Sequence, residues 1–164
     1  MAKLSGGLLM YKFEHGQLKV FLAHPGGPYF KNKDAGVWSI PKGELEGEED
    51  KLSAAIREFE EEIGFRPDGQ FFYLGSAKQK GGKLNHIWAF EGTWGNRQLP
   101  ESNTFPMEWP PKSGKTQYFP EVDKVDFFDI PTARQKIRDR QEIFLDWLME
   151  KLGIQAVSSN QLSK

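Results

Sequence analysis

Residues 43–65 read GELEGEEDKLSAAIREFEEEIGF, and this stretch decides the fold that we expect. Residues 51–63 have helical periodicity. At about 100° of rotation per residue, Arg57, Glu58, Glu61 and Glu62 fall within one arc of about 140°. Leu52, Ala55, Ile56, Phe59 and Ile63 fill an adjoining apolar arc, and Gly64 stands where a helix commonly ends in a left-handed cap. The pattern predicts an amphipathic helix that packs on a sheet and presents three carboxylates beside one guanidinium.

The acidic residues of this stretch suggest a cation site. Residues 44–62 contain nine acids and two bases, a net charge of −7, which leaves +6 on the remainder of a chain whose total is −1. Like charges on one helix face repel, and anions near a helix C-terminus are disfavoured. The alternative is an ordinary solvated acidic face that binds no ligand. With no cysteine in the chain, a metal site here would be built from oxygen, which suits Mg²⁺ or Mn²⁺.

The flanking sequence predicts an α/β protein in which helices cover a mixed sheet. The expected strands are short apolar runs at residues 8–11, 18–23, 37–40, 71–74, 86–90 and 125–128. We expect a second helix over 132–152 and a long functional loop over 92–120, which is rich in glycine and proline. Residues 1–153 are predicted to form one domain, and residues 154–164 a polar tail.

Composition limits the possible partners and location. A near-zero total charge argues against a long nucleic acid or a membrane surface as the partner. No apolar run approaches the roughly 20 residues that span a bilayer, so we expect a cytoplasmic protein. The oligomeric state stays open between monomer and homodimer.

The spacing of the acidic stretch resembles the Nudix box. Gly43 is followed after five residues by Glu49 and, after seven more, by the run from Arg57 to Phe65, so that every fixed position of that pattern is filled. Outside the box, Trp38–Gly43 looks like the usual lead-in, and 119–129 looks like the family's late strand. The resemblance implies the Nudix α/β/α sandwich.

The resemblance also implies an activity, namely Mg²⁺-dependent hydrolysis of a pyrophosphate bond in a nucleoside diphosphate linked to another group, with Mn²⁺ as a possible substitute. By position, the implied metal ligands are Glu58, Glu61, Glu62 and the Gly43 carbonyl. Arg57 would hold the carboxylates in place, and Glu49 would reach the metal or Arg57. The general base is left open among three residues: Glu58, Glu61 and Glu121.

Substrate contacts are sought among cations and aromatic rings. Lys42, beside the box, is a candidate phosphate ligand, and Trp109 and Tyr118 are candidates for stacking on a base. Lys78, Lys80 and Lys83 flank Gly81-Gly82, where they are either phosphate contacts or solvated surface lysines.

The segments 24–28 and 38–44 resemble a bacterial subgroup of predicted NTP pyrophosphohydrolases. A nucleoside triphosphate or a dinucleoside polyphosphate is therefore the expected substrate. An ADP-ribose or nucleotide-sugar pyrophosphatase is the first alternative. Lys80 stands where ADP-ribose members tend to have proline, and Gly82 stands where diadenosine polyphosphate members tend to have tyrosine. A binding module that senses a nucleotide without cleaving it is the second alternative.

Overall fold

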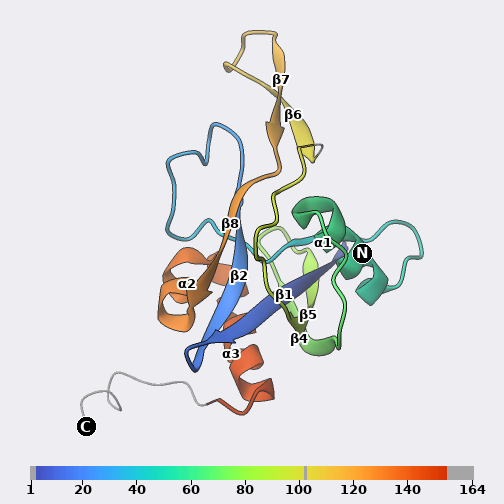
Figure 1. Ribbon diagram of the computed structural model, residues 1–164. Coiled ribbons are helices and arrows are strands. Elements are labelled where there is room, and N and C mark those ends of the chain that lie inside the picture. Colours follow the sequence, from blue (N-terminus) through green and yellow to red (C-terminus); the bar gives the residue numbers. More distant parts are fainter. Residues whose placement is uncertain (1–2, 102, 155–164) are drawn as a thin grey trace.

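The computed structural model describes residues 3–101 and 103–154 and contains one six-stranded mixed sheet (Figure 1). The strand order is β4-β5-β1-β2-β8, and β3 pairs with β1 as well. In chain order the elements are β1 (Leu4–Glu14), β2 (Gln17–Pro25), β3 (Lys42–Glu44), α1 (Lys51–Ile63), β4 (Phe72–Lys78), β5 (Leu84–Glu91), β6 (Thr104–Glu108), β7 (Thr116–Pro120), β8 (Val122–Asp129), α2 (Ile130–Lys136), the short 3₁₀ helix η1 (Asp139–Gln141) and α3 (Glu142–Lys151).

Strand β1 organises the sheet because it pairs with three others. It runs parallel to β5 along one edge. Along its other edge it pairs with β3 over its first residues and with β2 over its last residues, antiparallel in both cases. β2 and β3 thus share one edge of β1, each over a different part of the strand.

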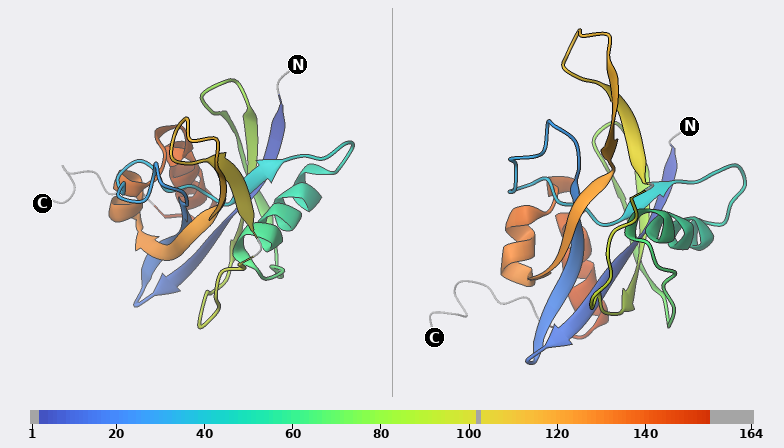
Figure 2. Two further views of the ribbon diagram at one scale, coloured as in Figure 1. Left: turned by 90° about the horizontal axis from the view of Figure 1, so that it is seen from above. Right: turned by 45° about the horizontal axis from the view of Figure 1, so that its top comes forward.

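Helices cover both faces of the sheet, as the alternation of side chains along β1 requires. Leu8 and Met10 point to one face and pack with Phe59 of α1. Leu9 and Tyr11 point to the other face, where they share a core with residues of α2 and α3. Figure 2 shows α1 on one side of the sheet and α2 and α3 on the other. The predicted α/β/α arrangement with a mixed sheet is confirmed.

Two glycines opposite each other in the β1–β3 pair lie beneath α1. Gly6 is the register partner of Gly43. A Cβ on Gly6 would lie 2.6 Å from the carbonyl oxygen of Lys51 and 3.1 Å from the amide nitrogen of Ala55, both in the backbone of α1. Helix and strand therefore approach more closely here than a side chain on Gly6 would permit.

The predicted loop over 92–120 is wrong in its second half. Strands β6 and β7 form an antiparallel hairpin, with Thr104 opposite Pro120 and Glu108 opposite Thr116, which projects away from the main sheet in Figure 1. The many turn-forming residues of this region concealed the strands. Pro106 is tolerated because a two-stranded ribbon has edges on which no amide hydrogen is needed.

The predicted strand over 37–40 is also wrong. This segment makes only isolated bridges, between Ala23 and Ser39 and between Trp38 and Ile137. The short strand β3 instead begins after Pro41. The chain crosses here from β2 to β1: Ser39 exchanges backbone hydrogen bonds with Ala23, and Pro41 accepts one from Leu8.

The single helix predicted over 132–152 is interrupted. Ile137 is extended, with φ −74° and ψ 149°, so α2 ends there. Trp38 causes the break, because its amide donates to the Lys136 carbonyl (3.0 Å) and its carbonyl accepts from the Arg138 amide (2.9 Å). Tertiary pairing has replaced helical hydrogen bonds at this point.

Other predictions agree with the structure. The helix over 51–63 is confirmed with its bounds, and Gly64 caps it in the left-handed conformation at φ 96°. The apolar runs of the other predicted strands fall in β1, β2, β4, β5 and β8, although β4 begins at Phe72 rather than at Phe71. Of the predicted tail, residues 155–164 lie outside the described residues. Among the described helices, none has the length and apolarity needed to cross a bilayer.

We expect Gly6→Ala to destabilise the protein by about 1–3 kcal/mol, because the added methyl group meets helix backbone that must move away from the sheet. Urea denaturation followed by tryptophan fluorescence measures this change. An unfolding midpoint equal to that of the wild type would contradict the close seating of α1 on Gly6.

Candidate active site

Helix α1 is held at both ends, and this orients its acidic face. The side chain of Asp50 accepts a hydrogen bond from the Ser53 amide (3.1 Å) at the N-cap, and the Gly64 amide donates to the Glu60 carbonyl (2.9 Å) at the C-cap. Phe59 and Ile63 are fully buried in the core on the sheet side. Rotation of the helix is thereby blocked, so the carboxylates on its other face keep their directions.

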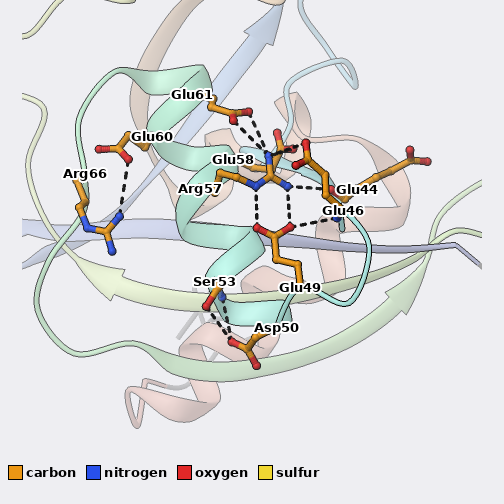
Figure 3. Close-up of polar contacts among 10 residues, drawn as sticks. All are labelled: Glu44, Glu46, Glu49, Asp50, Ser53, Arg57, Glu58, Glu60, Glu61 and Arg66. Carbon is orange, nitrogen blue, oxygen red and sulfur yellow. Dashed lines mark hydrogen bonds and ion pairs between the residues drawn. The ribbon is translucent and has the colours of Figure 1, made fainter.

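Arg57 forms hydrogen bonds with three carboxylates of the site (Figure 3). It donates to both oxygens of Glu49 from Nε (2.8 Å) and Nη2 (2.9 Å), a bidentate pair. Its Nη1 donates to Glu58 (2.9 Å) and to Glu61 (3.3 Å), and its Nη2 donates to the Glu44 carbonyl (3.2 Å). The hydrogen bonds from Arg57 to Glu49 lower the pKa of Glu49 to about 2. Of the two roles that the sequence suggested for Glu49, the structure shows the contact with Arg57.

Glu58 lies over Gly43. A Cβ built on Gly43 would fall 2.0 Å from the carboxyl carbon of Glu58, so only glycine leaves room for that side chain. Burial raises the pKa of Glu58, although Arg57 opposes the shift. Glu61 is different, because 54% of its side chain is exposed and it turns toward Arg57.

Glu62 has the most perturbed carboxylate of the site. Burial raises its pKa to about 8, and the nearby charges of Glu58, Glu121 and Glu61 act in the same direction, while Lys42 opposes them. None of the hydrogen bonds or ion pairs within the described residues engages its carboxylate oxygens. Glu62 is therefore a half-buried acid that lacks a partner suited to its negative charge.

Glu62 opens into a cleft of about 530 Å³ between the sheet edge and η1. The cleft is lined by Lys42 from β3, by Glu121 from the junction of β7 and β8, and by Arg138 and Arg140 from the break between α2 and α3. Lys42 donates a hydrogen bond to Gln79 (3.1 Å), and burial lowers the pKa of its ammonium group. Cationic side chains thus line the cleft together with the carboxyl groups of Glu62, Glu121 and Asp139.

Main-chain contacts fix the other walls of the cleft. Gln141 is buried and accepts a hydrogen bond from the Ile40 amide (2.8 Å), which holds η1 against the segment before β3. Glu121 stands at the base of the β6–β7 hairpin, where its amide donates to Asn103 (2.9 Å) and its carbonyl accepts from Gly26 (3.1 Å). The positions of Arg140 and Glu121 therefore depend on contacts between segments distant in sequence.

The structure brings together only part of the predicted site. Lys42, Glu62 and Glu121 line the cleft, and Glu58 lies beside them over Gly43. Trp109 and Tyr118 are on the β6–β7 hairpin and do not line the cleft; Tyr118 is 69% exposed, and Trp109 packs against Tyr29. Sequence reasoning missed Arg138, Arg140 and Gln141, because it placed them inside a continuous helix.

The donor set suits the expected metal ion in its chemistry but does not converge on one point. Within the described residues, no three acidic or histidine side chains converge closely enough to hold an ion. The reason is Arg57, which draws Glu58 and Glu61 toward itself and away from Glu62. The donor chemistry nevertheless fits a hard cation, because all the candidates are oxygens and a cation would stabilise the ionised form of Glu62, which burial disfavours. A shared ion would require Glu58 and Glu61 to leave Arg57 and turn toward Glu62.

Comparisons with known proteins agree with this picture. Three solved structures share the fold: a C. elegans Ap4A hydrolase binary complex (17% identity, 91% of this chain and 98% of that chain, TM-score 0.63), the NUDIX domain of Shewanella oneidensis NrtR complexed with ADP ribose (15%, 93% and 89%, 0.61) and a MutT/nudix family protein of Listeria innocua (15%, 92% and 94%, 0.58). No curated protein sequence matches significantly.

The family model described as NUDIX domain matches residues 7–148, which is most of the chain and includes the complete box on α1. The cleft and the box helix lie within that match, as does the main sheet apart from the first three residues of β1. The chain therefore belongs to the NUDIX domain family.

Proposed function

We propose that this chain hydrolyses a pyrophosphate bond in a nucleoside triphosphate or a dinucleoside polyphosphate, with Mg²⁺ as its cofactor and Mn²⁺ as a substitute. The observation that carries the proposal is the carboxyl group of Glu62, which no hydrogen bond or ion pair of the described residues engages, in a cleft that Lys42, Arg138 and Arg140 also line. A divalent cation would stabilise the ionised carboxyl group, and phosphate groups would pair with the cationic side chains. Of the solved structures with this fold, one is complexed with ADP ribose and another is an Ap4A hydrolase. Both compounds are nucleotides that contain a pyrophosphate bond.

The residues divide into three roles. Glu58, Glu61, Glu62 and the Gly43 carbonyl would hold the metal, which when bound neutralises phosphate charge and lowers the pKa of a water molecule. Arg57 positions Glu49, Glu58 and the loop before α1. Lys42 binds a phosphate oxygen at the cleft wall.

The reaction needs a proton acceptor. The water oxygen bonds to phosphorus, the bond from phosphorus to the bridging oxygen breaks, and the departing phosphate keeps the electron pair. A carboxylate within hydrogen-bond reach takes the proton of the water. Glu58, Glu61 and Glu121 are the candidates, and Glu121 is the one that comes from outside the box, at the junction of β7 and β8.

A substrate panel tests the proposed function. We expect the wild type with Mg²⁺ to release nucleoside monophosphate or phosphate from at least one of the NTPs or from Ap4A, and Glu61→Gln to lower kcat/KM by at least about 100-fold. Glu60→Gln is the matched control, because Glu60 neighbours Glu61 but is exposed and faces Arg66. If the wild type leaves every NTP, Ap4A and ADP-ribose intact, the enzymatic proposal is wrong and the nucleotide-sensing alternative gains support. Cleavage of ADP-ribose alone would favour the other alternative.

The pH dependence of stability tests the cation site at Glu62. In the metal-free protein the folded pKa of Glu62 lies near 8, above its value of 4.5 in the unfolded chain, so the folded state binds more protons between these values and loses stability as the pH rises. We expect Glu62→Gln to match the wild type near pH 4.5 and to exceed its free energy of unfolding by roughly 1–3 kcal/mol at pH 8.5. Added Mg²⁺ should raise the Tm of the wild type more than that of Glu62→Gln. Parallel pH profiles for the two proteins would rule out this account of Glu62.

Gly43 offers a change in the site that spares the fold. In Gly43→Ala the new methyl group meets the end of the flexible Glu58 side chain, which can move, whereas in Gly6→Ala it meets helix backbone. We therefore expect Gly43→Ala to lower kcat/KM at least about tenfold while changing the free energy of unfolding by less than about 1 kcal/mol. Activity assays and urea denaturation of both variants separate the two effects. Full activity in Gly43→Ala would mean that the position of Glu58 over Gly43 is not needed.

A further inference from the structure

A second hollow lies beside the cleft, at the turn between β4 and β5. It is lined by residues 78–83 together with Lys3 and Glu44, and it shares Gln79 and Lys80 with the cleft itself. The two hollows therefore meet at the turn. A ligand that is bound beside Glu62 in the cleft and extends past Lys80 would enter this second hollow.

Positive charge dominates the second hollow. Four lysines line it, Lys3, Lys78, Lys80 and Lys83, against the single acid Glu44. Glu44 is already paired with Lys83 at 3.1 Å and with Lys3 at 3.9 Å. Among the ion pairs of residues 3–101 and 103–154, none involves Lys78 or Lys80. Lys80 at the junction with the cleft and Lys78 beside it thus remain to meet an anion.

The turn is closed by backbone hydrogen bonds, and its two glycines leave the backbone bare. The Gln79 amide donates to the Lys83 carbonyl (2.8 Å) and the Gly82 amide to the Gln79 carbonyl (3.0 Å). Gly81 and Gly82 have φ of 96° and 90°, and a Cβ on either would have open space around it. An anion can therefore approach the main chain here without meeting a side chain.

Gln79 joins the turn to the active site. Its side-chain oxygen accepts hydrogen bonds from Lys42 (3.1 Å) and from Asn85 (3.2 Å), so the first lysine of the cleft and the turn are held together. Asn85 is itself buried and bonded to Ser5 of β1. These side-chain hydrogen bonds therefore connect the turn that carries the lysines to the main sheet.

The chemistry of the lining favours phosphate over a nucleobase. Across the described residues, no aromatic ring lines either hollow, so neither offers a surface on which a base could stack. Ammonium and guanidinium groups are instead the usual partners of phosphate oxygens. The pair of hollows resembles a track for several phosphates in series.

We propose that the β4–β5 turn, through Lys78, Lys80 and the bare backbone of Gly81 and Gly82, is a second phosphate-binding site that takes the distal phosphates of a substrate with more than two phosphates in its chain. This inference rests on the proposed function, because the metal end of the cleft sets where the phosphate chain begins. It selects dinucleoside polyphosphates over ADP-ribose, whose two phosphates would be used at the cleft.

Steady-state kinetics with substrates of different phosphate number test the site. The variant is Lys78→Ala/Lys80→Ala, and the control is Lys115→Ala/Lys151→Ala, which removes the same charge from two exposed lysines that line neither hollow. We expect the variant to lower kcat/KM for diadenosine tetraphosphate at least about tenfold more than for ADP-ribose, mainly through KM. The control should lower neither. Equal losses on both substrates, or no loss, would overturn the proposal.

Direct binding separates this proposal from the proposed function. Tripolyphosphate is titrated calorimetrically into the metal-free protein in EDTA, so that turnover is not needed. We expect the dissociation constant to rise at least about fivefold in Lys78→Ala/Lys80→Ala and to change less than about twofold in the control, with a dependence on salt. If this holds while the wild type cleaves nothing, the site stands and the proposed function fails. If the wild type cleaves diadenosine tetraphosphate but does not bind tripolyphosphate, or if both variants bind it equally, the second site is wrong.

Discussion

The close seating of α1 on the sheet is the constraint on which the rest of the structure depends. Gly6 and Gly43 face each other in the β1–β3 pair, and side chains on either would collide with α1 or with Glu58. Because the helix lies so near the strands, its polar face stands at the sheet edge, next to β3 and the cleft. The buried rings of the apolar face, with Phe59 against Phe21 and Phe90, keep the helix from turning about its axis. The direction of every carboxylate in the site follows from this packing.

The electrostatics of the site divide between stability and function. Arg57 shares its single positive charge among Glu49, Glu58 and Glu61 through hydrogen bonds (Figure 3). These contacts tie the loop before α1 to the helix and favour the folded state. Glu62 is left out of the network, and its burial costs stability once it is ionised. A fold selected for stability alone would not place an unpaired acid there, and such exceptions are expected at functional sites.

Local patterns were predictable where the sequence itself supplies the physical cause. The helix over 51–63 has its own cap signals and a clear apolar arc, and its bounds agree with the structure. Predictions were wrong where tertiary pairing competes with local preference. Trp38 takes the backbone hydrogen bonds at Lys136 and Arg138 and so ends α2, and strands β6 and β7 pair despite the prolines and glycines around them. Neither partner is visible in the local sequence, because each lies on the far side of a turn or of the domain.

The sequence by itself determined which side chains share the acidic face of α1, since the helical repeat places Arg57, Glu58, Glu61 and Glu62 together in any environment that forms the helix. It also determined that the metal-binding candidates are oxygen donors. Only the tertiary structure decided which of these acids faces the cleft and which pairs with Arg57. It alone decided that Lys42, Gln79, Glu121 and Arg138 meet there, because these residues come from segments far apart in the chain that the sheet brings together. Helical periodicity acts over a few residues, whereas a cleft is made by contacts whose partners no local pattern specifies.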